Sequence, residues 1–166
     1  MSNSSQYFIE KLGLQEHPEG GHYTSTFRGV DNITVRNMER PLYTSIYFLL
    51  RSQDISHLHR LKSDEIWYYH AGSSLTVHMI DPDGTYEAKK LGVNLDAGEV
   101  PQVVVPKNTI FGSSVDYPET FSLVGCMVAP GFDFAEFELF TQKELLAKYP
   151  QHEGVIRKMA YKKLTK

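Results

Sequence analysis

Between residues 23 and 140 the chain is a succession of short runs of β-branched and aromatic residues, separated by turn-forming residues. Runs of this composition are typical of β-strands, and so many of them at this spacing indicate a sandwich or a barrel. In order, the runs are YTSTFR, YTSIYFLL, EIWYYH, SLTVHMI, PQVVVP, FSLVGCMVA and FDFAEFELF. DPDGT at 81–85 predicts a tight hairpin between strands 73–80 and 85–91, because Asp-Gly tolerates positive φ angles. We therefore predict a mainly β fold.

Short helices are predicted at both ends of the chain. Serines at its start can cap a helix over residues 4–12, which Gly13 ends. Near the other end, Thr141 and Glu144 have the spacing of a capping box, and a second short helix is expected near 152–160. A length of 166 residues, without a linker or an internal repeat, predicts one domain over 1–166 with a barrel core at about 23–140.

Charge and cysteine content narrow the function classes. The formal charge is -3, from 17 basic and 20 acidic residues that are mixed along the chain, so we expect no nucleic-acid partner and no membrane partner. Cys126 is the only cysteine, and its apolar neighbours predict a buried strand rather than a reactive thiol. The sequence has no leader-like or membrane-length apolar stretch, which makes the cytoplasm the expected location.

The stretch SHLHRLKSDEIWYYHAG at 56–72 holds the residues best suited to chemistry. Alternate side chains of a strand share a face, so His57 and His59 are expected to point the same way, as are Glu65, Trp67 and Tyr69. Two imidazoles and a carboxylate suit a divalent transition metal, with His57, His59 and Glu65 as its ligands. A metal-free acid–base pair is the alternative.

The same stretch resembles the first motif of the cupin superfamily, in which H-x-H is followed by a glutamate and then a glycine. Here the motif reads His57-Leu58-His59, five residues, Glu65, six residues and Gly72. The resemblance implies a double-stranded β-helix, the jelly-roll barrel of the cupins.

The second cupin motif resembles Gly98 followed by PKNTIF at 106–111. Asn108 stands where the turn glycine is expected, and asparagine can adopt the same left-handed conformation. Phe111 stands where the resemblance places the last metal-binding histidine. A missing ligand weakens the metal hypothesis, although three protein ligands can hold a catalytic metal.

A closer resemblance links almost the whole chain to a branch of small, largely uncharacterised cupins. It is carried by HPEGGHY at 17–23, TSIYFLL at 44–50, LHRLKSDEIWYYHAG at 58–72, PQVVVP at 101–106 and VAPGFDFAEFEL at 128–139. In this branch the positions of His59 and Glu65 recur as a pair, whereas the His57 position is often apolar or small. The resemblance implies a homodimer with a small-molecule pocket, similar in shape to nucleotide-sugar epimerases and seed storage proteins.

These residues support two classes of function. In an isomerase or epimerase, His59 is the general base, Glu65 orients it or tunes its pKa, and Tyr69 or Tyr47 supplies the acid. The expected ligand-binding residues are Glu19, Tyr47, His57, Trp67 and Phe111. Aromatic lining favours a flat, carbohydrate-like or nucleotide-like ligand, but core packing explains these aromatic residues equally well. The alternatives are a non-catalytic ligand-binding or storage-like cupin and a metal-dependent enzyme.

The segment APGFDF opens the last predicted strand. We expect Phe132, Phe134 and Glu136 on one face of an aromatic strand that closes the barrel. In the alternative, an acidic side chain, Asp133 or Glu136, reaches the pocket.

Overall fold

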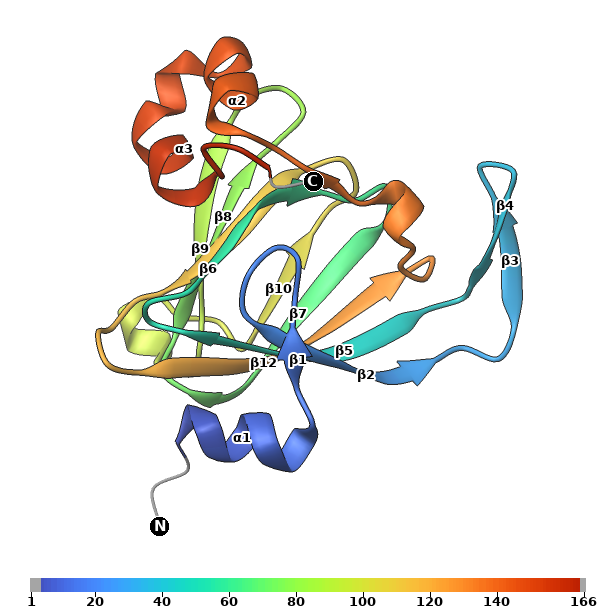
Figure 1. Ribbon diagram of the computed structural model, residues 1–166, viewed down its shortest axis with the longest axis horizontal. Coiled ribbons are helices and arrows are strands. Elements are labelled where there is room, and N and C mark those ends of the chain that lie inside the picture. The colour runs from blue at the N-terminus through green and yellow to red at the C-terminus, as the bar shows by residue number, and fades with distance from the viewer. Residues whose placement is uncertain (1–3, 165–166) are drawn as a thin grey trace.

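The computed structural model describes residues 4–164, and most of its strands form two antiparallel sheets that face each other (Figure 1). The larger sheet has six strands in the order β1 (Gln15–Glu16), β2 (His22–Arg28), β5 (Thr44–Arg51), β12 (Phe121–Ala129), β7 (Asp64–Gly72) and β10 (Gln102–Val105). The smaller sheet has five strands in the order β13 (Glu138–Leu139), β6 (Ile55–Arg60), β11 (Ile110–Val115), β8 (Leu75–Ile80) and β9 (Tyr86–Leu91). This arrangement is a jelly-roll barrel, so the predicted fold class is confirmed.

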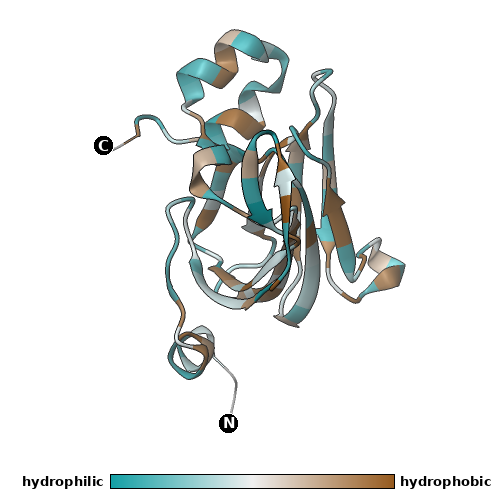
Figure 2. Cartoon of the chain, turned by 90° about the vertical axis from the view of Figure 1, so that its right-hand side faces the viewer, coloured by the Kyte–Doolittle hydropathy of each residue, from teal (hydrophilic) through white to brown (hydrophobic). Residues whose placement is uncertain are grey.

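The hydrophobic core lies between the two sheets, because alternate side chains of each strand point inward. Hydrophobic segments, brown in Figure 2, accordingly recur along the strands. The larger sheet contributes Phe48, Trp67, Val103, Val124 and Cys126 to this core, and the smaller sheet contributes Leu75, Val77, Met79, Leu91 and Phe111. The predicted burial of Cys126 is therefore confirmed.

The predicted terminal helices are present and lie at opposite ends of the barrel (Figure 1). They are α1 (Ser5–Leu12), α2 (Gln142–Lys148) and α3 (Glu153–Met159), and the short 3-10 helices are η1 (Leu95–Ala97), η2 (Phe134–Glu136) and η3 (Pro150–His152). The Ser4 hydroxyl accepts a hydrogen bond from the first turn of α1, and Gly13 ends that helix at a φ of 64°. Both hydrogen bonds of the predicted capping box begin α2. None of the helices within residues 4–164 has the length and apolar character that a membrane crossing demands.

The predicted hairpin joins β8 to β9, which pair from Leu75 opposite Leu91 to Ile80 opposite Tyr86. Gly84 takes a φ of 89° in the connection, as the Asp-Gly signal requires. A second hairpin, β3 (Asn32–Val35) with β4 (Met38–Pro41), projects from the barrel (Figure 1) and was not among the predicted strands.

The predicted strand over 132–140 is wrong. The chain instead forms a 3-10 turn over Phe134–Glu136, and only Glu138–Leu139 pair with β6. The Asp133 carboxylate accepts a hydrogen bond of 2.8 Å from the Ala135 amide, which favours a turn over an extended strand. The expected alternation of faces across this segment is therefore absent.

Candidate functional site

A cavity of about 190 Å³ lies between the two sheets near one end of the barrel. Strands β2, β5, β12 and β7 form one wall of the cavity, and the end of β6 forms part of the opposite wall. The loop at 17–19 and an aromatic segment at 132–137 complete the lining. The histidines and glutamates of this lining are His17, Glu19, His59 and Glu65.

A β-bulge in β6 turns His59 toward this cavity. Phe111 of β11 pairs with His59 and Ser113 pairs with Ser56, so β6 has one residue more than its partner between these two pairs. An extra residue interrupts the alternation of faces along a strand. Ser56 and His59 consequently both reach the side chain of Glu19.

The same bulge turns His57 away from His59. The His57 ring stacks on the Tyr161 ring with 3.6 Å between centroids, and its Nδ1 lies 2.8 Å from the Glu19 carbonyl oxygen. The expectation that His57 and His59 point the same way is therefore wrong, because it assumed an unbroken strand.

Glu19 is held in place from both sides. Its Oε1 accepts a hydrogen bond of 2.8 Å from the Ser56 hydroxyl, and its Oε2 lies 3.1 Å from Nε2 of His59. The following residue, Gly20, has a φ of 107°, and a Cβ there would collide with the Ile55 carbonyl oxygen. The Gly-Gly turn thus lets the loop lie against β6 and carry a carboxyl group that is 7 % exposed into the barrel.

Hydrogen bonding defines the protonation of the pair formed by Glu19 and His59. Nδ1 of His59 lies 2.7 Å from the His57 carbonyl oxygen, which can only accept, so Nδ1 carries the proton. Burial lowers the pKa of His59 to about 4 and leaves the ring neutral, with a lone pair on Nε2 facing Glu19. Two lone pairs at 3.1 Å would repel each other, and burial raises the pKa of Glu19, so the bridging proton belongs to Glu19.

Glu65 is a second acid–base centre on the wall formed by the larger sheet. Burial raises the pKa of the Glu65 carboxyl from 4.5 to about 8, and the nearby Glu19 acts in the same direction. Among the described residues, the carboxylate that contacts His59 is Glu19. The structure thus places Glu19, and not Glu65, beside His59. The predicted pair of His59 and Glu65 is therefore two separate acid–base centres.

The expected metal site at His57, His59 and Glu65 is not formed. The His57 ring stacks on Tyr161, and its Nδ1 lies at the Glu19 carbonyl oxygen. Phe111 packs on the His59 ring with 4.1 Å between centroids. No group of three or more His, Cys, Asp or Glu side chains within residues 4–164 is arranged to hold a metal ion. These residues therefore do not fit the metal that the cupin motif implies.

Trp67 and Phe111 lie below the cavity rather than in its lining. Each is 1 % exposed, and the Trp67 ring packs edge-on against Phe48 at 5.8 Å and Phe111 at 6.3 Å between centroids. Both belong to the hydrophobic core between the sheets, so core packing replaces their predicted role as ligand contacts.

Neither predicted tyrosine reaches the cavity. Tyr69 lies further along β7 than Trp67, and its hydroxyl donates a hydrogen bond of 2.5 Å to the Gly72 carbonyl oxygen. Tyr47 points to the other side of its strand from Phe48 and packs with the cluster under α1. The structure therefore does not bring the predicted acid, Tyr69 or Tyr47, to His59: the Tyr69 hydroxyl is bound to Gly72, and Tyr47 lies on the other face of its strand.

His17 lies two residues before Glu19, and the sequence predicts no role for it. The Glu19 amide donates to its Nδ1 at 3.2 Å, and its ring packs edge-on against Tyr23 with 4.5 Å between centroids. Burial lowers the pKa of His17. The sequence signal for His17 is its place in the HPEGG segment, two residues before the predicted ligand-binding residue Glu19.

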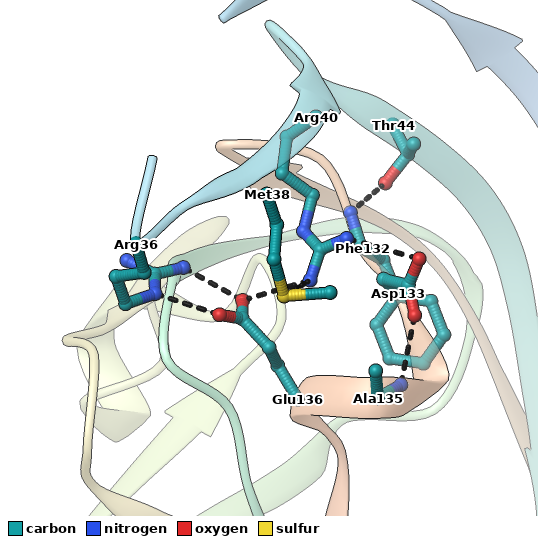
Figure 3. A network of polar contacts seen from close by, with 8 residues as sticks. All are labelled: Arg36, Met38, Arg40, Thr44, Phe132, Asp133, Ala135 and Glu136. Carbon is teal, nitrogen blue, oxygen red and sulfur yellow. Dashed lines mark hydrogen bonds and ion pairs between the residues drawn. The ribbon is translucent and has the colours of Figure 1, made fainter. Parts of the chain in front are cut away.

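Three phenylalanine rings form the lip of the cavity, at 132, 134 and 137. The rings are in mutual contact, with centroids 4.9 to 6.0 Å apart. Figure 3 shows Arg36 and Arg40 of the β3–β4 hairpin bound to Glu136 and Asp133 of this segment. Asp133 and Glu136 therefore bind arginines and are not part of the cavity lining.

Comparison with known proteins agrees with this architecture. A family model described as Cupin superfamily (DUF985) matches residues 6–140, which is most of the chain. The chain belongs to the cupin superfamily. This cupin is also similar to the uncharacterized protein YML079W of Saccharomyces cerevisiae, with 30% identity over 149 residues that cover 81% of this chain and 74% of the yeast protein.

Solved structures match this cupin over nearly its whole length. A hypothetical protein from Leishmania major has a TM-score of 0.92 and 43% identity, with 96% of this chain and 100% of that chain covered. Protein SO0799 from Shewanella oneidensis has a TM-score of 0.90 and 50% identity, with 96% and 99% covered. Oxalate decarboxylase from Bacillus subtilis has a TM-score of 0.55 and 17% identity, with 91% and 38% covered, and shares the fold alone.

Proposed function

We propose that this cupin catalyses proton transfer on a small polar molecule, as an isomerase or an epimerase does. The observation that carries the proposal is the presence of two separate buried acid–base centres around one cavity. Glu19 with His59 is the first centre, and Glu65 is the second. A reaction in which one group both removes and returns the proton needs a single acid–base centre. Removal of a proton at one atom and delivery of a proton at another uses two centres.

Each centre has a distinct part in the proposed reaction. The pair of Glu19 and His59 acts as the base in the form that has released its bridging proton to solvent, in which two lone pairs lie 3.1 Å apart and a proton taken from the substrate relieves their repulsion. After the reaction the pair returns this proton to solvent and Glu65 takes one up, which restores the starting state. The Glu65 carboxyl, with a pKa of about 8, holds a proton at neutral pH and donates it to a substrate oxygen or carbon. One proton is removed and one is supplied, so the product is an isomer of the substrate.

The aromatic lip supports a ligand with a flat or ring-shaped apolar face. Phe132, Phe134 and Phe137 offer faces and edges against which a sugar ring or a base can stack. We therefore propose a carbohydrate or nucleotide-like ligand. The same lip also favours the second candidate, a cupin that binds such a ligand without turning it over.

Deuterium exchange tests the proposal. The protein is incubated in D₂O with aldoses, sugar acids and sugar phosphates, and proton NMR follows the loss of the hydrogen next to each carbonyl group. We expect exchange with the unaltered protein and a loss of at least about a hundredfold in Glu19→Gln and in Glu65→Gln, because each variant removes one centre.

Glu99→Gln is the matched control for these variants. Glu99 is buried to a similar extent, at 8 % exposure, and accepts a hydrogen bond from the Asn94 amide outside the cavity. Equal exchange in Glu19→Gln and Glu99→Gln would contradict the catalytic role. Binding of a compound without any exchange would instead support the non-catalytic candidate.

A further inference from the structure

A second β-bulge turns Arg28 toward the cavity. Ser25 and Phe27 of β2 pair with consecutive residues of β5, so Thr26 is an extra residue in β2. A bulge reverses the faces of the residues beyond it. Arg28 therefore lies on the same face as Ser25 and lines the cavity, whereas Phe27 points outward and is 68 % exposed.

Arg28 differs from the other arginines in its charge partners. Arg36, Arg40, Arg51, Arg60 and Arg157 each bind a carboxylate. Within the described part of the chain Arg28 has no such ion pair, although it borders a cavity. A guanidinium presents a planar set of N–H donors that matches a carboxylate or a phosphate with two parallel hydrogen bonds. An unpaired arginine at a cavity edge is thus suited to an anionic group of a ligand.

Strand register places Arg28 and Glu65 at the two ends of one row across the cavity wall. Arg28 pairs with Thr44, Thr44 with Val128, and Val128 with Glu65. All four side chains line the cavity, which shows that they share one face. Three strand spacings separate the ends of the row, or about 14 Å along the sheet, and less through space where the sheet curves.

We infer that the ligand of this cupin is an elongated anion, whose carboxylate or phosphate group binds Arg28 while its other end lies between Glu19 and Glu65. This inference rests on the proposed function, since it names the class of substrate on which the proton transfer acts. The length of the row requires several bonds between the anionic group and the atom that exchanges its proton. The unpaired guanidinium also selects against neutral molecules of the same size.

Binding of three probes tests the inference by calorimetry at low salt. Glucose 6-phosphate and gluconate carry the phosphate and the carboxylate, and glucose is the neutral probe. We expect at least one anion to bind more tightly than glucose. In Arg28→Gln the affinity for that anion is expected to fall about tenfold, because a charge-assisted pair of hydrogen bonds is lost. The effect is expected to shrink as salt is added, because the side chain is exposed.

Arg157→Gln removes the same charge from α3, where Arg157 pairs with Glu153 at the surface, and it controls for net charge. Its affinity for each probe is expected to equal that of the unaltered protein. Arg28→Lys keeps the charge and loses the planar fork, so an intermediate affinity is expected. The relative affinity for the two anions distinguishes a phosphate site from a carboxylate site.

Equal affinity of the Arg28→Gln and Arg157→Gln proteins for the anions would overturn the inference, as would the failure of both anions to bind the unaltered protein. These binding results do not depend on whether the protein converts any of the probes. If the anion binds through Arg28 but no deuterium exchange is found in any bound compound, the proposed function fails and the anion site stands.

Discussion

At the residue scale, burial decides the chemistry of the cavity more than residue identity does. Glu65 is 7 % exposed and lines the cavity, and this burial, with a further contribution from the nearby Glu19 carboxyl group, raises its pKa. The Glu65 carboxyl therefore keeps its proton to about pH 8. His59 is also buried, but a base loses its charge on burial, so the two side chains are both neutral near pH 7.

The raised pKa of Glu65 predicts a pH-dependent cost to stability. Between pH 4.5 and 8 the unfolded chain ionises this group while the folded protein keeps it protonated, so its contribution to stability falls as the pH rises through that range. Glu65→Gln removes this loss. We expect the free energy of unfolding of the variant, measured in urea, to rise relative to the unaltered protein from pH 5 to 8. A difference that does not change with pH would refute the raised pKa.

His59 predicts the opposite trend. Its pKa falls from 6.5 to about 4 on folding, so its contribution is present above pH 6.5 and is lost as the pH falls toward 4. In His59→Gln we therefore expect a shallower loss of stability on acidification over this range. Urea denaturation at each pH measures this loss of stability. An equal loss between pH 6.5 and 4 in His59→Gln and in the unaltered protein would count against a neutral His59.

At the element scale, the site depends on irregularities in regular strands. The bulge in β6 brings His59 to Glu19, and the bulge in β2 brings Arg28 to the cavity. The aromatic lip depends in turn on the β3–β4 hairpin, whose turn residue Arg36 has a φ of 50° and contacts Glu136 at 2.6 Å (Figure 3). The hairpin thus positions the lip, the sheets position His59 and Glu65, and the loop at 17–19 positions Glu19.

Glu136 is predicted to be the residue that holds the lip to the hairpin. It binds Arg36 and also Arg40, whose side chain is 2 % exposed. After Glu136→Ala, Asp133 would be the one carboxylate left to Arg40 among the described residues. Loss of a partner from a buried charge is costly, and we expect the free energy of unfolding to fall by about 2 kcal/mol.

Glu138→Ala is the control for Glu136→Ala. Glu138 lies two residues after Glu136, and its exposed ion pair with Arg60 is the contact that this substitution breaks. We expect a loss below about 1 kcal/mol. Urea denaturation compares the two variants. Equal losses would mean that the network of Figure 3 contributes no more than a surface pair.

At the scale of the whole molecule, the C-terminal segment connects the outside of the barrel to the cavity. Helices α2 and α3 cover Leu58, Ile80 and Ile110 of the smaller sheet. Beyond α3, the Tyr161 hydroxyl donates to the Pro18 carbonyl oxygen at 3.1 Å, and its ring stacks on His57. The end of the chain therefore braces the loop that carries Glu19.

Tyr161→Ala is expected to loosen that loop. The His57 amide donates to the Glu19 carbonyl oxygen at 2.7 Å, so hydrogen exchange of this amide reports on the loop. We expect faster exchange in Tyr161→Ala. Tyr161→Phe keeps the ring stack and loses one exposed hydrogen bond, so a much smaller change is expected. Equal exchange in all three proteins would show that the stack does not brace the loop.

Homodimerisation stays a prediction, and the exposed apolar side chains suggest where a second copy would bind. Phe27, Val30, Leu42 and Tyr43 lie at the base of the β3–β4 hairpin and are 39 to 94 % exposed. We expect light scattering to give a dimer mass for the unaltered protein and a monomer mass for Phe27→Asp. Val93→Asp, at another exposed valine, is expected to remain dimeric. A monomer mass for the unaltered protein would contradict the prediction.

The sequence by itself determined the features that depend on neighbours along the chain. The paired strands around DPDGT, the helix caps at Ser4 and Thr141, and the left-handed Asn108, with a φ of 67°, follow from local conformational preferences. A sandwich or a barrel was predictable because many short β-branched and aromatic runs follow one another at close spacing, and the resemblance to cupins narrowed this to the jelly-roll barrel.

Only the tertiary structure decided which side chains meet. Glu19 and Ser56 are 37 positions apart, and their hydrogen bond exists because a loop crosses β6. The bulges that turn His59 inward, His57 outward and Arg28 toward the cavity arise from pairing with a neighbouring strand. A period of two within one strand cannot predict where such an extra residue falls, since its position is set by the register of the partner.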